Sequence, residues 1–165
     1  MKILAIVADI YPEKLGGAEV HFVEVAKRIT SKVESLLIPR VSYPHLPNLS
    51  GLFFILFATP VMIYNAVKYR PDLIWATLDF PQAQVGALVK LFTGRPLYIT
   101  SQNPLLGEEE LVGIGGQGVT FLVSLAFRQA DVVAAVSSYS AAQAKRLGAK
   151  KVIVIPNGVD LDKFL

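Results

Sequence analysis

Cysteine is absent from the 165 residues of this chain, and histidine occurs only twice. The first absence excludes disulfide bonds, thiolate metal sites and cysteine nucleophiles, and it fits a reducing, cytoplasmic setting. The two histidines, His21 and His45, form neither a metal-ligand set nor a catalytic triad in the sequence. His21 falls on a predicted helix, where we expect it at the surface. We therefore expect no metal and no cofactor.

Charged residues are also scarce, at 18% of the chain against 53% hydrophobic residues. The net charge is +3, and the lysines and arginines are scattered rather than clustered. Such a diffuse positive charge suits phosphate-bearing ligands or the surface of an anionic membrane. The chain has neither the concentrated basic patch nor a motif of the nucleic-acid-binding domains, so we expect no nucleic-acid partner.

One stretch lacks charge altogether, residues 49–67, which read LSGLFFILFATPVMIYNAV. Its length is sufficient for a membrane span, but Pro60 and Asn65 interrupt it and no second stretch of this kind occurs. Two other interpretations are a helix buried against a sheet and a helix that dips into a membrane face. We favour packing of Phe54 and Phe57 on the sheet; peripheral contact with anionic lipid is the alternative.

Short apolar runs alternate with helix-like patterns along nearly the whole chain. Continuous apolar runs of this length are typical of buried strands in a parallel sheet. The pattern predicts strands at 2–8, 33–39, 71–77, 96–100, 130–137 and 150–156, and helices at 18–30, 50–69, 81–92, 118–129 and 137–148. This order predicts an α/β fold: a Rossmann-like, doubly wound, mainly parallel six-stranded sheet with helices on both faces.

The loops that follow the strands are the places to look for a site, because ligands of such sheets bind beyond the carboxyl ends of the strands. Gly16 and Gly17 follow the first strand and open a helix, where unsatisfied N–H groups and the helix dipole favour a phosphate. A plain tight turn explains the two glycines equally well. Glu19 either complements the dipole or reaches a ligand. Asp79, after the third strand, either binds a hydroxyl or caps a turn.

Three segments of the chain resemble those of a known family. They are YPEKLGGAEVHFVEVAKRI near the start, RPDLIWAT in the middle and ADVVAAVSSYSAAQAKRLGAKKVIVIPNGVDLDKFL at the end. All three are similar to segments of the family 4 (group 1) retaining glycosyltransferases of the GT-B fold. The I-P-N-G-V-D-x-x-x-F motif of the last segment is quite specific, and the resemblance covers essentially the whole chain.

The resemblance implies two Rossmann-like domains with an active site in the cleft between them. Residues 1–165 correspond to a single amino-terminal, acceptor-side domain, and we expect the carboxyl-terminal donor domain to be absent. We therefore expect part of an enzyme that transfers a sugar, with retention, from a nucleotide-sugar donor to a sugar or lipid-linked acceptor. The nucleotide-sugar is a substrate rather than a cofactor, and the domain alone is expected to be inactive.

By position, the resemblance places Gly16 and Gly17 against the donor diphosphate. The residues that we expect on the acceptor side of the cleft are Glu19, Asp79, Ser137, Asn157 and Gly158. The family often has a histidine after its fourth strand, in a pattern like V-T-x-H-D, whereas this chain reads YITSQNP with Gln102 at that position. Glutamine forms hydrogen bonds but carries no charge, so a protonic role would be lost here. An orienting role could pass to Gln102 or Asn103, the two candidates for a catalytic position.

Two further functions stay open at this point. The chain could be a stand-alone Rossmann-like module that binds a phosphate ligand or a partner protein, in which case it would bind tightly without a second domain. It could also act at a membrane surface, as a cytoplasmic protein with peripheral membrane contact. A missing second domain would expose an apolar cleft face to solvent, which predicts self-association into homo-oligomers.

Overall fold

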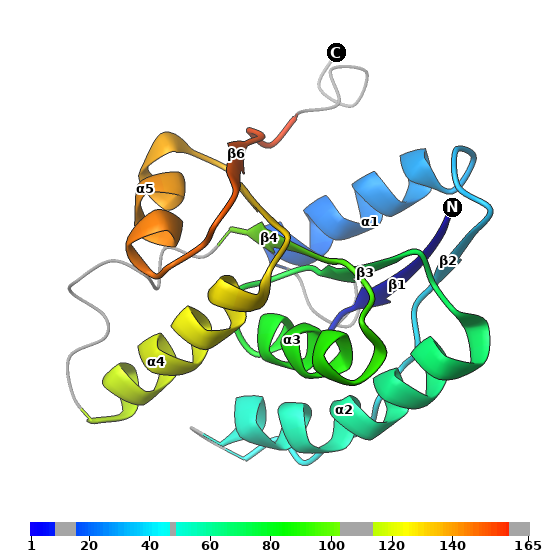
Figure 1. Ribbon diagram of the computed structural model, residues 1–165, viewed down its shortest axis with the longest axis horizontal. Helices are drawn as coiled ribbons and strands as arrows, with labels where there is room; N and C mark the ends of the chain where they lie inside the picture. The colour runs from blue at the N-terminus through cyan, green and yellow to red at the C-terminus, as the bar shows by residue number, and fades with distance from the viewer. Residues whose placement is uncertain (9–15, 47–48, 103–113, 159–165) are drawn as a thin grey trace.

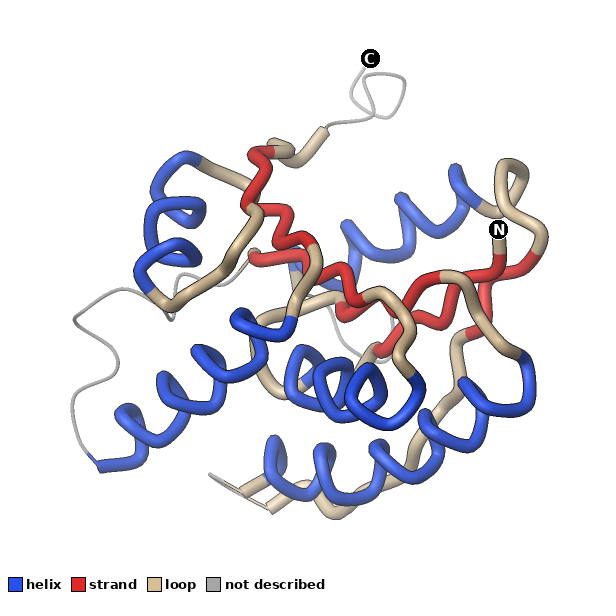
Figure 2. The backbone as a smooth tube through the Cα atoms, viewed as in Figure 1, coloured by secondary structure: helices blue, strands red, loops and turns tan. Residues whose placement is uncertain are grey.

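Six parallel strands form one sheet in the computed structural model, which describes residues 1–8, 16–46, 49–102 and 114–158. The strand order is β2-β1-β3-β4-β5-β6 (Figures 1 and 2). The strands are β1 (Lys2–Ile6), β2 (Ser35–Leu37), β3 (Leu73–Ala76), β4 (Leu97–Ser101), β5 (Val132–Ala135) and β6 (Val152–Val154). The helices are α1 (Gly17–Ile29), α2 (Ser50–Tyr69), α3 (Gln82–Thr93), α4 (Ile114–Gln129) and α5 (Ser138–Arg146). The predicted Rossmann-like α/β fold is confirmed.

The sheet differs from the prediction in detail. All five strand pairs are parallel, and every strand except β4 is shorter than the apolar run that predicted it. β2 and β6 are the shortest strands, with three residues each, and they lie at the two edges of the sheet with a hydrogen-bonding neighbour on one side. α4 begins at residue 114 instead of 118, so the end of the predicted loop 101–117 is helical. Its first residues are rich in glycine, a weak helix former, which hid this turn from the sequence pattern.

The helices lie on both faces of the sheet because the chain changes direction once. From β1 it moves outward to β2, and every later connection runs the opposite way along the sheet. Right-handed crossovers therefore place α1 on one face and α2 to α5 on the other. β1 serves both faces in alternation: Ile3 packs with Phe22 of α1, whereas Leu4 belongs to the larger core beneath α2 to α5. Figure 1 shows α1 above the strands and α2 and α3 below them.

α2 contains the uncharged stretch, and by length and composition it could cross a membrane. In this structure the helix packs along α3. The buried stripe repeats every four residues and comprises Phe54, Ala58, Met62 and Ala66. Phe57 lies off this stripe and is 43% exposed, because three residues rotate a side chain by about 300° around the helix axis. The prediction of packing is therefore confirmed for Phe54, which is fully buried in the larger core, and wrong for Phe57.

Candidate functional site

Buried polar side chains gather at the carboxyl ends of β3 and β4. Seven polar or charged residues are buried in the described part of the chain, and six of them follow or end β3 and β4: Thr77, Asp79, Gln82, Gln84, Thr100 and Ser101. Burial of polar groups costs free energy, and the rest of the core is almost entirely apolar. Their concentration at these strand ends therefore marks the region as distinctive. The same region contains the topological switch point between β1 and β3, where doubly wound folds bind their ligands.

The segment after β3 is held beneath the surface. Thr77 donates a hydrogen bond from Oγ1 to the carbonyl of Ile6 at 3.0 Å, which joins the ends of β3 and β1. Asp79 is 1% exposed, and its carbonyl accepts a hydrogen bond from Nε2 of Gln84 at 3.2 Å. Asp79 therefore lies within the turn that leads into α3, and it does not line the groove beside α1.

The two glycines before and at the start of α1 differ in their surroundings. Gly16 is the N-cap, with an extended backbone and no side chain to cap the helix. A Cβ at Gly16 would collide with the carboxylate of Glu19, which folds back over the helix terminus from the position that a capping-box acid occupies. A Cβ at Gly17 would meet nothing within 4 Å. The carboxylate of Glu19 is the far end of a flexible side chain that can move aside, so packing of the described chain requires a glycine at neither position.

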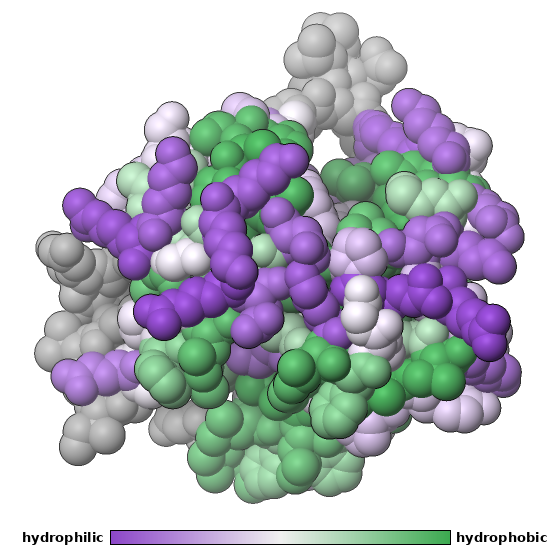
Figure 3. Space-filling view, viewed as in Figure 1, coloured by the Kyte–Doolittle hydropathy of each residue, from purple (hydrophilic) through white to green (hydrophobic). Residues whose placement is uncertain are grey.

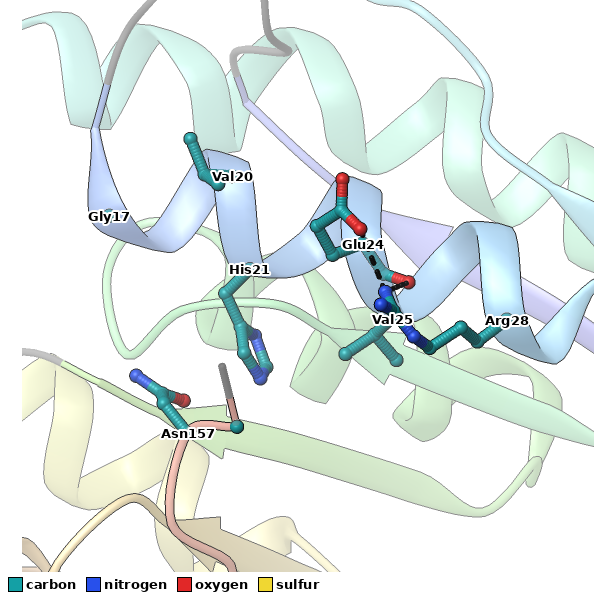
Figure 4. Close-up of a pocket in the computed structure, with 8 residues that line it drawn as sticks. Gly17, Val20, His21, Glu24, Val25, Arg28 and Asn157 are labelled. Atoms are coloured by element: carbon teal, nitrogen blue, oxygen red, sulfur yellow. Dashed lines mark hydrogen bonds and ion pairs between the residues drawn. The ribbon is translucent and has the colours of Figure 1, made fainter. Parts of the chain in front are cut away.

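A groove of about 310 Å³ joins α1 to the segment after β6. Its lining residues are Gly17, Val20, His21, Glu24, Val25, Arg28, Asn157 and Gly158. In Figure 4, the side chain of His21 extends from α1 toward the segment that carries Asn157, and both residues line the groove. At the other end of the groove, Nη1 of Arg28 lies 2.7 Å from Oε2 of Glu24, so this ion pair belongs to α1 itself. The groove therefore brings together one predicted donor residue, Gly17, and two predicted cleft residues, Asn157 and Gly158.

His21 makes a contact that the sequence did not predict. Its Nδ1 lies 2.6 Å from Nε2 of Gln102, the residue directly after β4. An amide nitrogen can only donate, so Nδ1 accepts and the neutral ring carries its proton on Nε2. Burial lowers the pKa of the imidazole, which favours this neutral form. The expectation of a surface position for His21 is wrong, because the ring is half-buried and turned toward the sheet edge.

His21 therefore lies beside Gln102, the position at which the family that this chain resembles often has a histidine. The two residues are 81 positions apart in the sequence, and only the packing of α1 on the sheet brings them together. Asn103, the other catalytic candidate, lies outside the described residues.

Ser137 has a structural role. It is the N-cap of α5, and its Oγ accepts a hydrogen bond from the backbone nitrogen of Ser140 at 3.1 Å. This is the usual function of a serine at a helix start. The side chain does not line the groove between α1 and the segment after β6.

A second, apolar groove of about 310 Å³ continues from His21 across the α1 face of the sheet. It reaches Trp75 of β3, Tyr98 of β4 and Ile155 after β6. Trp75 is 5% exposed, as expected of a core residue, and its indole N–H donates to Oγ1 of Thr100 at 2.9 Å. In the described ranges, no group of three His, Asp or Glu residues could hold a metal ion.

Comparisons with known proteins show which family the chain belongs to. The model of Glycosyltransferase Family 4 matches residues 15–163. A protein of Thermosipho africanus (strain TCF52B), UDP-N-acetylglucosamine--N-acetylmuramyl-(pentapeptide) pyrophosphoryl-undecaprenol N-acetylglucosamine transferase, is 29% identical over 143 residues, which cover 84% of this chain and 42% of that protein.

Solved structures show the same fold. Anabaena Alr3699/HepE in complex with UDP-glucose matches 98% of this chain and 45% of its own, with a TM-score of 0.72 and 24% identity. Its complex with UDP and glucose gives a TM-score of 0.69 and 23% identity, and covers 98% of this chain and 46% of the other. The chain thus spans less than half the length of these proteins. The family match covers most of the sequence, and this chain belongs to Glycosyltransferase Family 4.

Proposed function

We propose that this chain is the amino-terminal, acceptor-side domain of a retaining glycosyltransferase, which transfers a sugar from a nucleotide-sugar donor to an acceptor. Family membership supports the transferase role of a full-length protein. The observation that carries the proposal for the site is the groove between α1 and the segment after β6, at the edge where doubly wound sheets bind ligands. A second domain would close this groove and supply the remaining donor contacts.

The donor diphosphate is proposed to bind at the start of α1. The first N–H groups of a helix attract an anion, and the open space beside Gly17 would let a phosphate approach the backbone. Glu19 would have to leave its position over Gly16, because its carboxylate would repel the diphosphate there. The Anabaena structures hold UDP-glucose, UDP and glucose, or UDP, which supports a uridine nucleotide as the probe.

His21, Gln102 and Asn157 are proposed to position the acceptor. The Nε2–H of a neutral His21 can donate a hydrogen bond to an acceptor oxygen, and Gln102 fixes the ring through Nδ1. We assign no nucleophile and no general base to this chain. A lipid-linked acceptor is supported by the name of the Thermosipho relative, which acts on a pyrophosphoryl-undecaprenol substrate. We also propose a cytoplasmic location, in keeping with a chain that contains no cysteine.

The experiment is a pair of measurements on the purified 165-residue chain. Titration with UDP should give weak binding, with a Kd on the order of millimolar, because the nucleobase and ribose lack a second domain. Incubation with labelled UDP-glucose and a sugar acceptor should give no transfer. Transfer by the chain alone would contradict the acceptor-side assignment. Tight, saturable binding of a phosphate ligand would favour a stand-alone binding module instead.

A further inference from the structure

The outer side of α2, α3 and α4 is an exposed apolar surface. Its exposed large hydrophobic residues include Leu52, Leu56, Tyr64, Leu91, Phe92 and Phe121, each at least 50% exposed. The three helices pack side by side, and a groove of about 360 Å³ between them is lined by apolar residues from each. Figure 3 shows hydrophobic side chains gathered over α2, at the lower edge of the molecule. We refer to these six residues and their surroundings as the α2–α4 face.

The charged side chains on the three helices themselves are all of one sign. α2, α3 and α4 contain 20, 12 and 16 residues, and their sequences include no Asp or Glu. Each has one basic residue in its last turn, namely Lys68, Lys90 and Arg128. α1 differs, because it mixes acidic and basic side chains as solvent-exposed helices usually do. The α2–α4 face is therefore apolar with a cationic end.

The end of α2 concentrates this character. Lys68 lies with its Nζ 5.5 Å from the ring centre of Tyr64 and 5.1 Å from that of Tyr69. Arg70 follows directly and is exposed. Tyrosines beside a flexible cation at the end of an apolar helix match the preferences of the boundary between lipid headgroups and acyl chains. Lys90 is paired with Asp131 at 2.6 Å, so Lys68 and Arg70 are the better candidates for contact with headgroups.

From this arrangement we infer that the α2–α4 face is a docking surface for an anionic lipid bilayer. Exposed leucines and phenylalanines enter the boundary of the acyl chains, and the cationic end contacts acidic headgroups. A second copy of the chain fits less well. In a pair of such faces, no carboxylate on α2, α3 or α4 of either copy could pair with the cations of the other. The inference does not depend on sugar transfer, since the surface lies on the face of the sheet opposite α1.

Flotation with vesicles tests the proposal on the intact chain. We expect binding to vesicles of phosphatidylcholine with roughly one third phosphatidylglycerol, little binding to phosphatidylcholine alone, and weakening at high salt. The variant Leu56→Asp/Leu91→Asp places charges at positions that are 66% and 73% exposed, so the fold should persist. It should lower the partition coefficient at least about tenfold. Tyr139→Asp, on α5 and 57% exposed, is the matched control and should float like the wild type.

A second pair of variants tests the charges. Lys68→Gln/Arg70→Gln should lower the partition coefficient roughly thirtyfold, from the usual contribution of about 1 kcal/mol for each basic residue at an anionic surface. Lys145→Gln/Lys150→Gln removes the same net charge on the far side of α4 and should change it by less than about threefold. Circular dichroism confirms the fold of every variant.

Three results would overturn the proposal. The first is absence of the wild type from all floated vesicles. The second is undiminished flotation of Leu56→Asp/Leu91→Asp. The third is that the wild type does not bind vesicles but forms a concentration-dependent dimer, seen by light scattering, which Leu56→Asp/Leu91→Asp abolishes. The α2–α4 face would then bind a second copy of the chain.

Discussion

Replacing Gly17 by alanine separates the two explanations of the glycine pair, a phosphate site and a plain turn. Residue 17 is the first residue of α1, and its φ is not among the positive values, which occur at Gly94 and Gly148 among the described glycines. The added Cβ would meet nothing within 4 Å. Alanine forms helices better and restricts the unfolded chain, so the free energy of unfolding should stay constant or rise by about 0.5 kcal/mol.

Binding should respond in the opposite direction. The new methyl group would occupy the space through which a phosphate is proposed to reach the backbone N–H groups. A hydrogen bond to a charged group contributes about 1.5–3 kcal/mol, so loss of one should weaken UDP binding roughly tenfold to a hundredfold. NMR titration of the 165-residue chain with UDP suits such weak binding. Gly118→Ala is the matched control, because residue 118 lies in α4 and its Cβ would also meet nothing within 4 Å.

Two results would refute this reasoning. If Gly17→Ala binds UDP as the wild type does, the glycine serves a plain turn and the phosphate site lies elsewhere. If the variant instead unfolds more than about 1 kcal/mol more easily, the space beside Gly17 is needed for packing, contrary to the structure.

Three further predictions concern stability, measured by urea denaturation. Burial lowers the pKa of His21 below its ordinary value of 6.5, so at lower pH the unfolded chain binds more protons than the folded chain. The free energy of unfolding should therefore fall as the pH drops below about 6.5, and it should fall less steeply in His21→Gln. Asp131→Asn should lower the free energy of unfolding by about 1 kcal/mol, because Oδ2 of Asp131 accepts hydrogen bonds from Nζ of Lys90 at 2.6 Å and from the backbone nitrogen of Leu97 at 2.7 Å. An unchanged urea midpoint would show that these bonds merely replace bonds to water. Phe54→Ala should cost about 3–5 kcal/mol and its neighbour Phe57→Ala less than about 1, and equal losses would contradict the one-sided packing of α2.

The strands and the start of α1 could be predicted from the sequence because both have local signals. A short apolar run followed by Gly16 and Gly17 defines a strand, a turn and a helix start within one stretch of chain. The partnership of His21 with Gln102 could not be predicted in this way, because it depends on where α1 lies over the sheet. A lone histidine on a helix gives no signal of its own until the strand order is known.

α2 shows a different limit of sequence reasoning. Its residues are apolar on every side, so no periodicity distinguishes the face of Phe54, which is buried, from the face of Leu56, which is 66% exposed. The sequence predicted a helix there correctly. Only the position of α3 decides which side of that helix is covered, and therefore which apolar side chains remain outside.

The groove has one wall near the start of the chain and the other after its last strand. β6, which carries Asn157 and Gly158 into that wall, is a three-residue edge strand whose Ile153 and Val154 are 37% and 47% exposed. A ligand that contacts both walls can bind only while this strand is docked, so its binding free energy adds to the free energy of docking. Ligand concentration would thereby govern fraying of this sheet edge, and the order of β6 would report occupancy of the site.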